Sequence, residues 1–189
     1  DSEEDHEVFL EAVKLEMYAD KVFCFSPKGD VLTFPSGATP IDFAYAIHTR
    51  IGNSCVGAKV DGLRVPLWTK LRNGQSVEII TAQGQNPQST WLDMTETGKA
   101  KTAIRRALRE ADRERMVVMG KALLQTAFEH IGKKVTDKSL ELAASKMRFS
   151  DYKELLARVG STEVRPGHVV QLVHPEVTSA DDFDVDQAS

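Results

Sequence analysis

Residues 26–82 contain closely spaced turn signals between short apolar runs, and this pattern limits the region to a small sheet with tight connections. The apolar runs lie at 22–25, 31–34, 55–60, 63–66 and 77–81. The turn signals between them include Pro27-Lys28-Gly29, Asp61-Gly62 and Asn73-Gly74. An aspartate–glycine pair favours a two-residue type I′ turn, and a proline–glycine turn between apolar runs is typical of a hairpin. We therefore expect five short strands.

One helix is expected between the second and third runs, over residues 39–51. Thr39 can cap its start, Pro40 suits its first turn, and Asp42 complements the positive end of the helix dipole. Gly52 is expected to end it in a left-handed conformation. The order β-β-α-β-β-β predicts an α+β domain in which a mixed sheet wraps over one helix, a β-grasp (ubiquitin-like) fold.

His48 lies near the end of this helix, beside its apolar stripe. The stripe consists of Phe43, Ala44, Ile47 and Ile51. We expect Phe43 and Ile47 to be buried in the core. His48 either packs at the edge of that core with one nitrogen in water, or recognises a ligand. It has no metal or catalytic partner at a suitable spacing.

Several longer motifs lie between residues 22 and 160. They include Phe25-Ser26-Pro27-Lys28-Gly29-Asp30, Ala44-Tyr45-Ala46-Ile47-His48-Thr49, Val56-Gly57-Ala58-Lys59-Val60, Val77-Glu78-Ile79-Ile80-Thr81, Trp91-Leu92 and Lys99-Ala100-Lys101. Together they resemble the TGS domain of long RelA/SpoT-type stringent-response proteins and the helical domain that follows it. TGS domains also occur in threonyl-tRNA synthetases and Obg-type GTPases, but the last two motifs favour the stringent-response family.

The resemblance implies a role for His48, because the matching histidine of the family lies where the TGS domain meets the 3′ end of an uncharged tRNA. An imidazole can stack on an unpaired base and can hydrogen-bond to a ribose hydroxyl or a phosphate. Arg50 and Lys59 are candidate phosphate contacts near this histidine. The alternative interpretation of these two residues is ordinary solvated surface charge.

The chain after residue 95 has the apolar spacing of helices. Residues 100–111 form the first, and basic side chains occupy its other faces. The basic residues are Lys99, Lys101, Arg105, Arg106 and Arg109. The first four are candidate RNA contacts, and the alternative is that the run forms ion pairs with neighbouring acids on the helix surface. Those acids are Glu110, Asp112 and Glu114.

Three further helices are predicted, over residues 115–131, around residues 140–147, and from a cap at Ser150 to Gly160. Four short helices would make a small all-α bundle. A helix over residues 8–18 is expected to lead into the sheet domain. Residues 169–173 fit either a strand or a short helix.

These patterns divide the chain into five parts, namely a linker helix (1–20), the TGS β-grasp domain (21–82), a linker (83–94), the helical domain (95–160) and a short apolar segment with an acidic tail (161–189). We expect Trp91 to anchor the linker against the helical bundle. Residues 176–189 combine acids with few apolar groups, and we expect them to be disordered.

The net charge of −4 hides an uneven distribution. Five acidic residues lie in residues 1–7 and five in residues 176–189, and neither segment contains Lys or Arg. The chain between them is therefore mildly basic, which allows it to approach phosphate groups.

The sequence lacks the marks of a catalytic or membrane-spanning chain. It has no phosphate-binding glycine loop, His-Asp metal pair or nucleophile with an arranged base. No apolar run approaches the roughly 18 residues of a membrane span. Cys24 and Cys55 lie inside apolar runs, so we expect buried free thiols in a reducing cytosol. These observations predict a non-catalytic, cytoplasmic regulatory fragment with no cofactor, metal or membrane association.

The resemblance also implies the parent and its partners. It places hydrolase and synthetase halves before Asp1, in an enzyme that makes and degrades guanosine tetraphosphate and pentaphosphate. It implies deacylated tRNA and the ribosome as partners. The alternatives are a protein partner, either acyl carrier protein or a nitrogen phosphotransferase protein, and restraint of the parent's own catalytic domains.

Overall fold

The computed structural model describes residues 2–177, apart from the side chains of residues 11–19. It divides into two compact units, and the boundary falls within one helix, between Leu108 and Arg109. Most of the predicted disordered tail, from residue 178 onward, lies outside the described residues.

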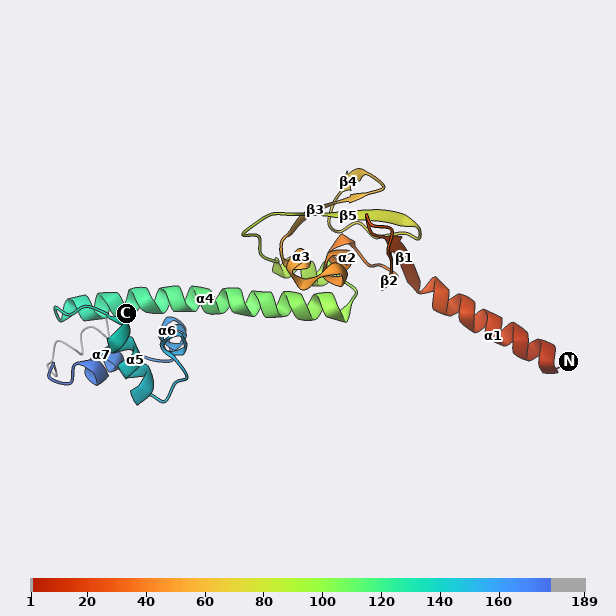
Figure 1. Cartoon of the computed structure of the whole chain (residues 1–189). Coiled ribbons are helices and arrows are strands. Elements are labelled where there is room, and N and C mark those ends of the chain that lie inside the picture. Colours follow the sequence, from red (N-terminus) through yellow and green to blue (C-terminus); the bar gives the residue numbers. More distant parts are fainter. Residues whose placement is uncertain (1, 178–189) are drawn as a thin grey trace. The chain divides into compact units, whose positions relative to one another are not determined.

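The first unit contains a mixed five-stranded sheet in the order β2-β1-β5-β3-β4 (Figure 1). β1 and β5 pair in parallel, and the other neighbouring strands are antiparallel. The strands are β1 Lys21–Phe25, β2 Val31–Pro35, β3 Cys55–Val60, β4 Leu63–Val65 and β5 Gln75–Thr81, and helix α1 (Ser2–Ala19) precedes them. The α+β fold is therefore confirmed, with every strand within two residues of its predicted run.

The turn between β3 and β4 has the geometry that its sequence predicts. Asp61 and Gly62 have φ values of 51° and 81°. Both central residues of a type I′ turn need positive φ. Val60 and Leu63 pair directly across the turn, so the turn also sets the register of this hairpin.

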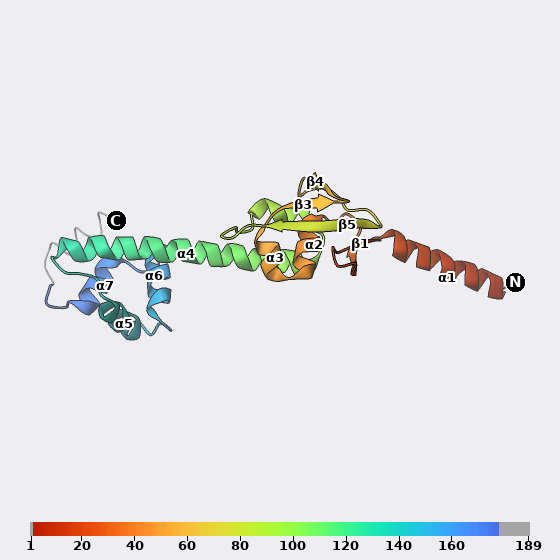
Figure 2. The ribbon, with the colours of Figure 1, turned by 45° about the horizontal axis from the view of Figure 1, so that its top comes forward.

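Helix α2 (Pro40–Ile47) covers one face of the sheet (Figures 1 and 2). It places Phe43 fully inside the core, with the centroid of its ring 5.6 Å from that of Phe34. The same core includes Cys24, Ala38, Val60, Leu71 and Val77. The prediction that Phe43 is a core residue is confirmed.

Both cysteines are free and fully buried, as predicted. Burial raises the pKa of the Cys55 thiol to about 11 and also raises the pKa of Cys24. Because the thiolate is the reactive form, these protonated thiols are packing groups.

The helix predicted over residues 39–51 is broken at His48. α2 ends at Ile47, His48 is extended with φ −167° and ψ 145°, and a separate short helix α3 spans Thr49–Asn53. Gly52, which was predicted to end the helix, lies inside α3. The prediction that Ile47 is buried was wrong, because α2 stops there instead of continuing over the core and leaves this side chain 44% exposed.

Trp91 anchors the segment after the sheet and clusters both with Ala100 and Ile104 of the first predicted bundle helix, as expected, and with residues of α2. It lies in a short 3₁₀ helix, η1 (Ser89–Met94), and is only 3% exposed. Its cluster joins α2 to the first turns of α4 (Gly98–His130). The buried members are Ile41, Ala44, Tyr45, Cys55, Trp91, Ala100 and Ile104. The start of α4 therefore belongs to the core of the first unit.

A buried carboxylate strengthens the same junction. The side chain of Asp42, in the first turn of α2, is fully buried. Its oxygens accept the backbone N–H groups of Thr39, Glu96 and Thr97 and the hydroxyl of Thr97, at distances of 2.9 to 3.1 Å. The Thr97 hydroxyl also accepts the N–H of Ala100 at 3.2 Å, in the first turn of α4. Asp42 thus links the start of α2 to the segment just before α4, which is distant in sequence.

Substitution of Asp42 by alanine is expected to lower the free energy of unfolding of the first unit by about 2–3 kcal/mol, because several buried N–H groups lose a charged acceptor. Denaturant unfolding followed by tryptophan fluorescence measures this loss. Asp93→Ala is the matched control, since Asp93 is exposed and lies in the adjacent 3₁₀ helix. Equal losses for the two variants would contradict the assigned role of Asp42.

The second unit is formed by the end of α4 and three shorter helices. Two helices were predicted where α4 runs unbroken from Gly98 to His130. The reason is that residues 111–115 contain neither glycine nor proline, so nothing in them stops a helix. The other helices are α5 Asp137–Lys146, α6 Tyr152–Gly160 and α7 Pro166–Val173. Residues 169–173, for which the sequence allowed a strand or a short helix, belong to helix α7.

The core of the second unit extends beyond residue 160, the predicted end of the helical domain. It includes Leu124, Phe128, Leu140, Leu155 and Val159 together with Val164, Val169 and Val170. The apolar segment that the sequence left outside the domain is therefore part of its core.

α4 and α6 cross at two glycines. A Cβ atom added to Gly120 would overlap the carbonyl oxygen of Leu156, and one added to Gly160 would overlap that of Met116. Backbone therefore packs directly on backbone at this crossing, which only glycine permits.

Candidate nucleic-acid interface

His48 lies exposed at the break between α2 and α3. Its Nδ1 accepts the backbone N–H of Arg50 at 3.0 Å, so the imidazole caps the start of α3. In a neutral imidazole one nitrogen accepts and the other carries the proton. Because Nδ1 is the acceptor, Nε2 carries the proton. Within the described residues Nε2 has no hydrogen-bond partner, so this N–H is available to a ligand.

Arg50 lies two residues from His48, in the same turn, and is exposed. No hydrogen bond or ion pair of its guanidinium is found in the part of the chain that the structure describes. The structure therefore places the backbone of Arg50 against His48 and leaves its guanidinium exposed, and its role as a phosphate contact stays a prediction.

Lys59 lies elsewhere. It points away from the helices, because its neighbours Ala58 and Val60 on β3 are buried beneath the sheet. Its cross-strand partners are Arg64 on β4 and Glu78 on β5. Lys59 therefore lies in a charged row on the outer face of the sheet, and the structure does not place it beside His48.

The basic residues at the start of α4 divide into two groups. Lys101 is half-buried, and its Nζ donates to the carbonyl oxygen of Leu92 at 2.7 Å, which ties η1 to α4. Lys99, Arg105 and Arg106 are exposed, and among the described residues none of them forms an ion pair. Two of the three acids of the predicted ion pairs have other partners, since Asp112 pairs with Arg115 and Glu114 with Lys153.

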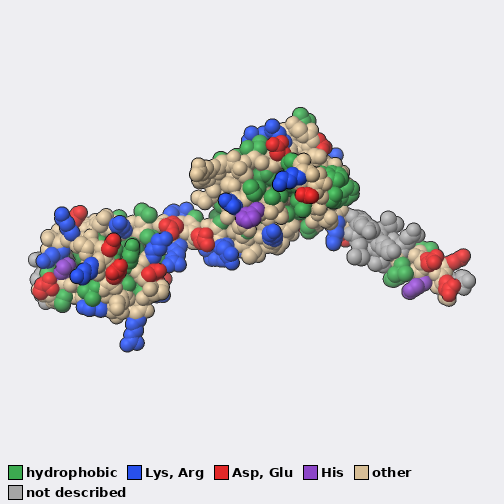
Figure 3. Space-filling model, in the orientation of Figure 1, with side chains coloured by type: hydrophobic (Ala, Val, Ile, Leu, Met, Phe, Trp, Pro, Cys, Tyr) green, Lys and Arg blue, Asp and Glu red, His purple; other side chains and the backbone are tan. Residues whose placement is uncertain are grey.

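Charges of both signs are mixed over the visible face of the chain. Figure 3 shows Lys and Arg side chains interspersed with Asp and Glu, without a continuous basic surface. An RNA partner would therefore need specific contacts in addition to general attraction by charge.

A cavity of about 380 Å³ adjoins the C-terminal end of α2. The turn between β1 and β2 forms one wall, and Ala46 and Ile47 form the other. Its other lining residues are Ser26, Pro27, Lys28, Asp30 and Leu32. The sequence prediction missed this cavity because it placed Ile47 in the core.

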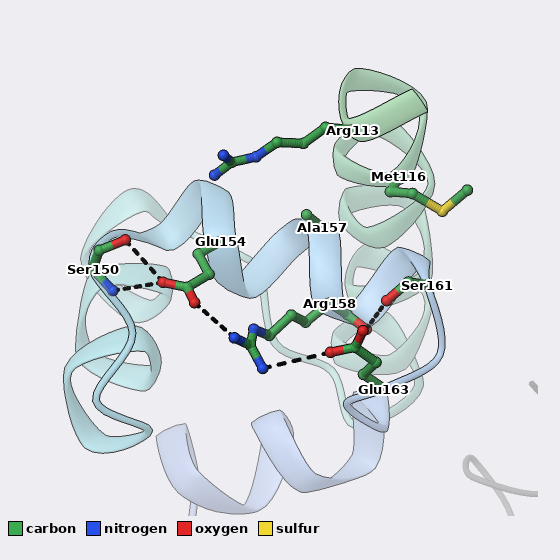
Figure 4. A pocket seen from close by; sticks show the side chains of 8 residues that line it. All are labelled: Arg113, Met116, Ser150, Glu154, Ala157, Arg158, Ser161 and Glu163. Atoms are coloured by element: carbon green, nitrogen blue, oxygen red, sulfur yellow. Dashed lines mark hydrogen bonds and ion pairs between the residues drawn. The ribbon is translucent and has the colours of Figure 1, made fainter. Parts of the chain in front are cut away.

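A larger hollow of about 520 Å³ lies in the second unit and is drawn in Figure 4. Arg158 bridges Glu154 at 2.9 Å and Glu163 at 3.5 Å. The backbone N–H and the hydroxyl of Ser150 donate to Glu154, and with Arg158 they hold the pKa of Glu154 below its usual value. The charged groups along this hollow largely satisfy one another, which argues for a structural role.

The cap of α6 differs by one residue from the prediction. Asp151 is the N-cap, and its Oδ1 accepts the N–H of Glu154 at 2.8 Å. Ser150 instead binds the Glu154 carboxylate.

Two features are absent from the described residues. No described helix is long and apolar enough to cross a membrane. The same residues contain no group of three or more His, Cys, Asp or Glu side chains arranged to hold a metal ion.

Comparison with known proteins identifies both regions. The model of the TGS domain family matches residues 22–81, and that of the RelA/SpoT AH domain matches residues 107–174. A GTP pyrophosphokinase rsh of Brucella abortus is 47% identical over 170 residues, which are 90% of this chain and 23% of that protein. A guanosine-3′,5′-bis(diphosphate) 3′-pyrophosphohydrolase of Vibrio cholerae is 40% identical over 157 residues, 82% of this chain and 22% of that protein.

A guanosine-3′,5′-bis(diphosphate) 3′-pyrophosphohydrolase of Aquifex aeolicus is 36% identical over 167 residues, which are 88% of this chain and 24% of that protein. The chain thus spans less than a quarter of the length of these relatives. Matches to both domain families in one chain confirm the predicted resemblance. The chain therefore consists of a TGS domain followed by a RelA/SpoT AH domain, as in the RelA/SpoT (Rsh) proteins.

Proposed function

We propose that this chain is a regulatory region of an enzyme of guanosine tetraphosphate and pentaphosphate metabolism, and that it senses the 3′ end of uncharged tRNA on the ribosome through His48. The observation that carries the proposal is the exposed imidazole at the break between α2 and α3, whose Nε2–H is unoccupied within the described residues. The names of the relatives, a GTP pyrophosphokinase and a guanosine-3′,5′-bis(diphosphate) 3′-pyrophosphohydrolase, support the proposed parent activity.

The chemistry of the site fits an unpaired RNA end. The imidazole of His48 offers a flat face for an unstacked base and one N–H donor for an oxygen of the RNA. Arg50 supplies a positive charge two residues away. Lys99, Arg105 and Arg106 add exposed positive charge at the start of α4. Lys59 is left out of this site because it lies on the outer face of the sheet.

α2 also offers a route from the proposed sensing residue to the helical region. His48 follows its last residue, and Asp42 in its first turn binds the backbone of Glu96 and Thr97 just before α4. A displacement of α2 on binding would therefore act on the start of α4. This connection supports a relay from the TGS domain towards the rest of the parent protein.

His48→Asn is expected to weaken binding of deacylated tRNA by about 1–3 kcal/mol, because a base loses its stacking partner. Stability is expected to change by less than about 0.5 kcal/mol, since asparagine is also a good N-cap for α3. The measurement compares wild type and variant with charged and uncharged tRNA on ribosomes. Wild type should bind uncharged tRNA better, and the variant should lose most of that preference.

Lys59→Ala is the control, because it removes a positive charge from the other face of the sheet. It should leave the discrimination between charged and uncharged tRNA unchanged. If His48→Asn discriminates as well as wild type, His48 is not the sensing residue.

A second candidate function is the binding of a protein partner, either acyl carrier protein or a nitrogen phosphotransferase protein. The half-exposed Ile47 beside the 380 Å³ cavity supports it, because exposed apolar side chains next to a hollow suit a protein ligand. Binding of either purified protein that survives His48→Asn, together with unchanged tRNA discrimination, would favour this candidate.

A further inference from the structure

The break at His48 is supported by a close contact between α2 and α3. A Cβ atom added to Gly52 would overlap three atoms of the Tyr45 ring. The ring of Tyr45 is fully buried and occupies the space that any other residue at position 52 would need. Glycine is therefore required here for close packing and not for its backbone freedom.

A hydrogen bond holds the far end of the same helix. The Tyr45 hydroxyl donates to Oδ1 of Asn53, the last residue of α3, at 2.8 Å. Burial, with a smaller effect of Cys55, raises the pKa of Tyr45, so the hydroxyl keeps its proton and remains a donor. α3 contains only five residues, and so short a helix depends on contacts outside itself. Tyr45 supplies two of these contacts.

The start of α3 is held by His48 itself. Its Nδ1 accepts the Arg50 N–H at 3.0 Å, a capping bond that forms only while the residues after His48 are helical. If α3 lost its outside contacts and unfolded, the imidazole would lose this donor and its proton could occupy either nitrogen. The folded state of α3 therefore favours one tautomer of His48.

We propose that Tyr45, Gly52 and Asn53 are positioning residues that hold His48 as the Nε2–H tautomer, so that the site selects RNA ends that present a hydrogen-bond acceptor. This inference rests on the proposed recognition of RNA by His48. A free ribose hydroxyl offers an oxygen that accepts well. An aminoacyl ester converts one of the two ribose hydroxyls into the bridging oxygen of an ester, which accepts poorly, and its good acceptor, the carbonyl oxygen, belongs to a bulky acyl group displaced from the ribose. The tautomer thus supplies a chemical reason for discrimination between uncharged and charged ends.

The first test reads the tautomer without any RNA. Long-range ¹H–¹⁵N spectra of the whole chain distinguish a protonated from an unprotonated imidazole nitrogen. Wild type should show His48 with an unprotonated Nδ1 and a protonated Nε2. Gly52→Ala and Asn53→Ala should each show averaged nitrogens. Asn53→Ala adds no atoms, so it decides the result if Gly52→Ala does not fold.

Gly98→Ala is the matched glycine control, because nothing lies within 4 Å of an added Cβ at that position. It should keep the wild-type tautomer. A wild-type tautomer in folded Gly52→Ala or in Asn53→Ala would overturn the inference whatever the RNA results are.

The second test uses a short RNA hairpin with a single-stranded CCA end. Its terminal ribose either carries both hydroxyls or lacks both. Wild type should bind the hydroxylated end roughly five- to tenfold more tightly, the value of one hydrogen bond. Asn53→Ala should lose this preference while it keeps its fold.

The two possible failures are distinct. An intact tautomer effect with no binding of either RNA would support the positioning role and refute the proposed function. Equal binding of the two RNAs by wild type would overturn the selection of an acceptor.

Discussion

Replacing Phe43 by alanine is expected to lower the free energy of unfolding of the first unit by about 3–5 kcal/mol. The ring is fully buried between α2 and the sheet, against Phe34, and its removal leaves a cavity that the surrounding strands cannot fill. Denaturant unfolding followed by tryptophan fluorescence measures the effect. Both tryptophans of the chain, Trp68 and Trp91, lie in the first unit, so the signal reports this unit.

Phe23→Ala is the matched control. Phe23 lies on the same sheet but is 42% exposed, with an edge contact to Phe25. Its truncation should cost less than about 1.5 kcal/mol. A loss at Phe43 no larger than the loss at Phe23 would show that α2 does not carry the core of this unit.

Gly120→Val should destabilise the second unit by more than about 3 kcal/mol. The added side chain would overlap the carbonyl oxygen of Leu156, and backbone cannot give way as a flexible side chain can. α6 would have to move away from α4, which would open the core around Leu155 and Val159. Hydrogen exchange at the amides of α6 measures the loss.

The control on the same helix is Ala122→Val, because Ala122 is exposed. Its cost should be a few tenths of a kcal/mol, about the difference in helix propensity. Unchanged exchange rates in Gly120→Val would mean that the close crossing of α4 and α6 is wrong.

Local signals account for the elements that the sequence predicted well. The Asp61-Gly62 turn is correct because its residues tolerate positive φ wherever they lie. The strands are correct because short β-rich runs lie between such turns. The two helices predicted in place of α4 were wrong because local signals were overinterpreted. The apolar spacing is interrupted between residues 111 and 115, but no residue there breaks a helix, so α4 continues through them.

The candidate site was predictable in part. The sequence identified His48 and Arg50, and the structure places them in one exposed turn. It did not predict the break at His48, because this depends on the Tyr45 ring lying against Gly52. Which face of the sheet carries Lys59 depends on the strand register. The hydrogen bond that removes Lys101 from the exposed basic residues depends on a carbonyl oxygen nine residues earlier in the chain.

The sequence by itself determined the β-grasp order, the helical region, the burial of Phe43 and the identity of the candidate recognition histidine. The first three depend on turn chemistry and apolar spacing, which act over a few residues, and the histidine was identified by the resemblance of its motif to the TGS family. Only the tertiary structure decided the pairing of Asp42 with Glu96 and Thr97, more than 50 residues away, and the glycine crossing of α4 and α6. The physical reason is that hydrogen-bond pairing and close packing depend on which atoms the completed fold brings together, and neighbouring residues do not encode that information.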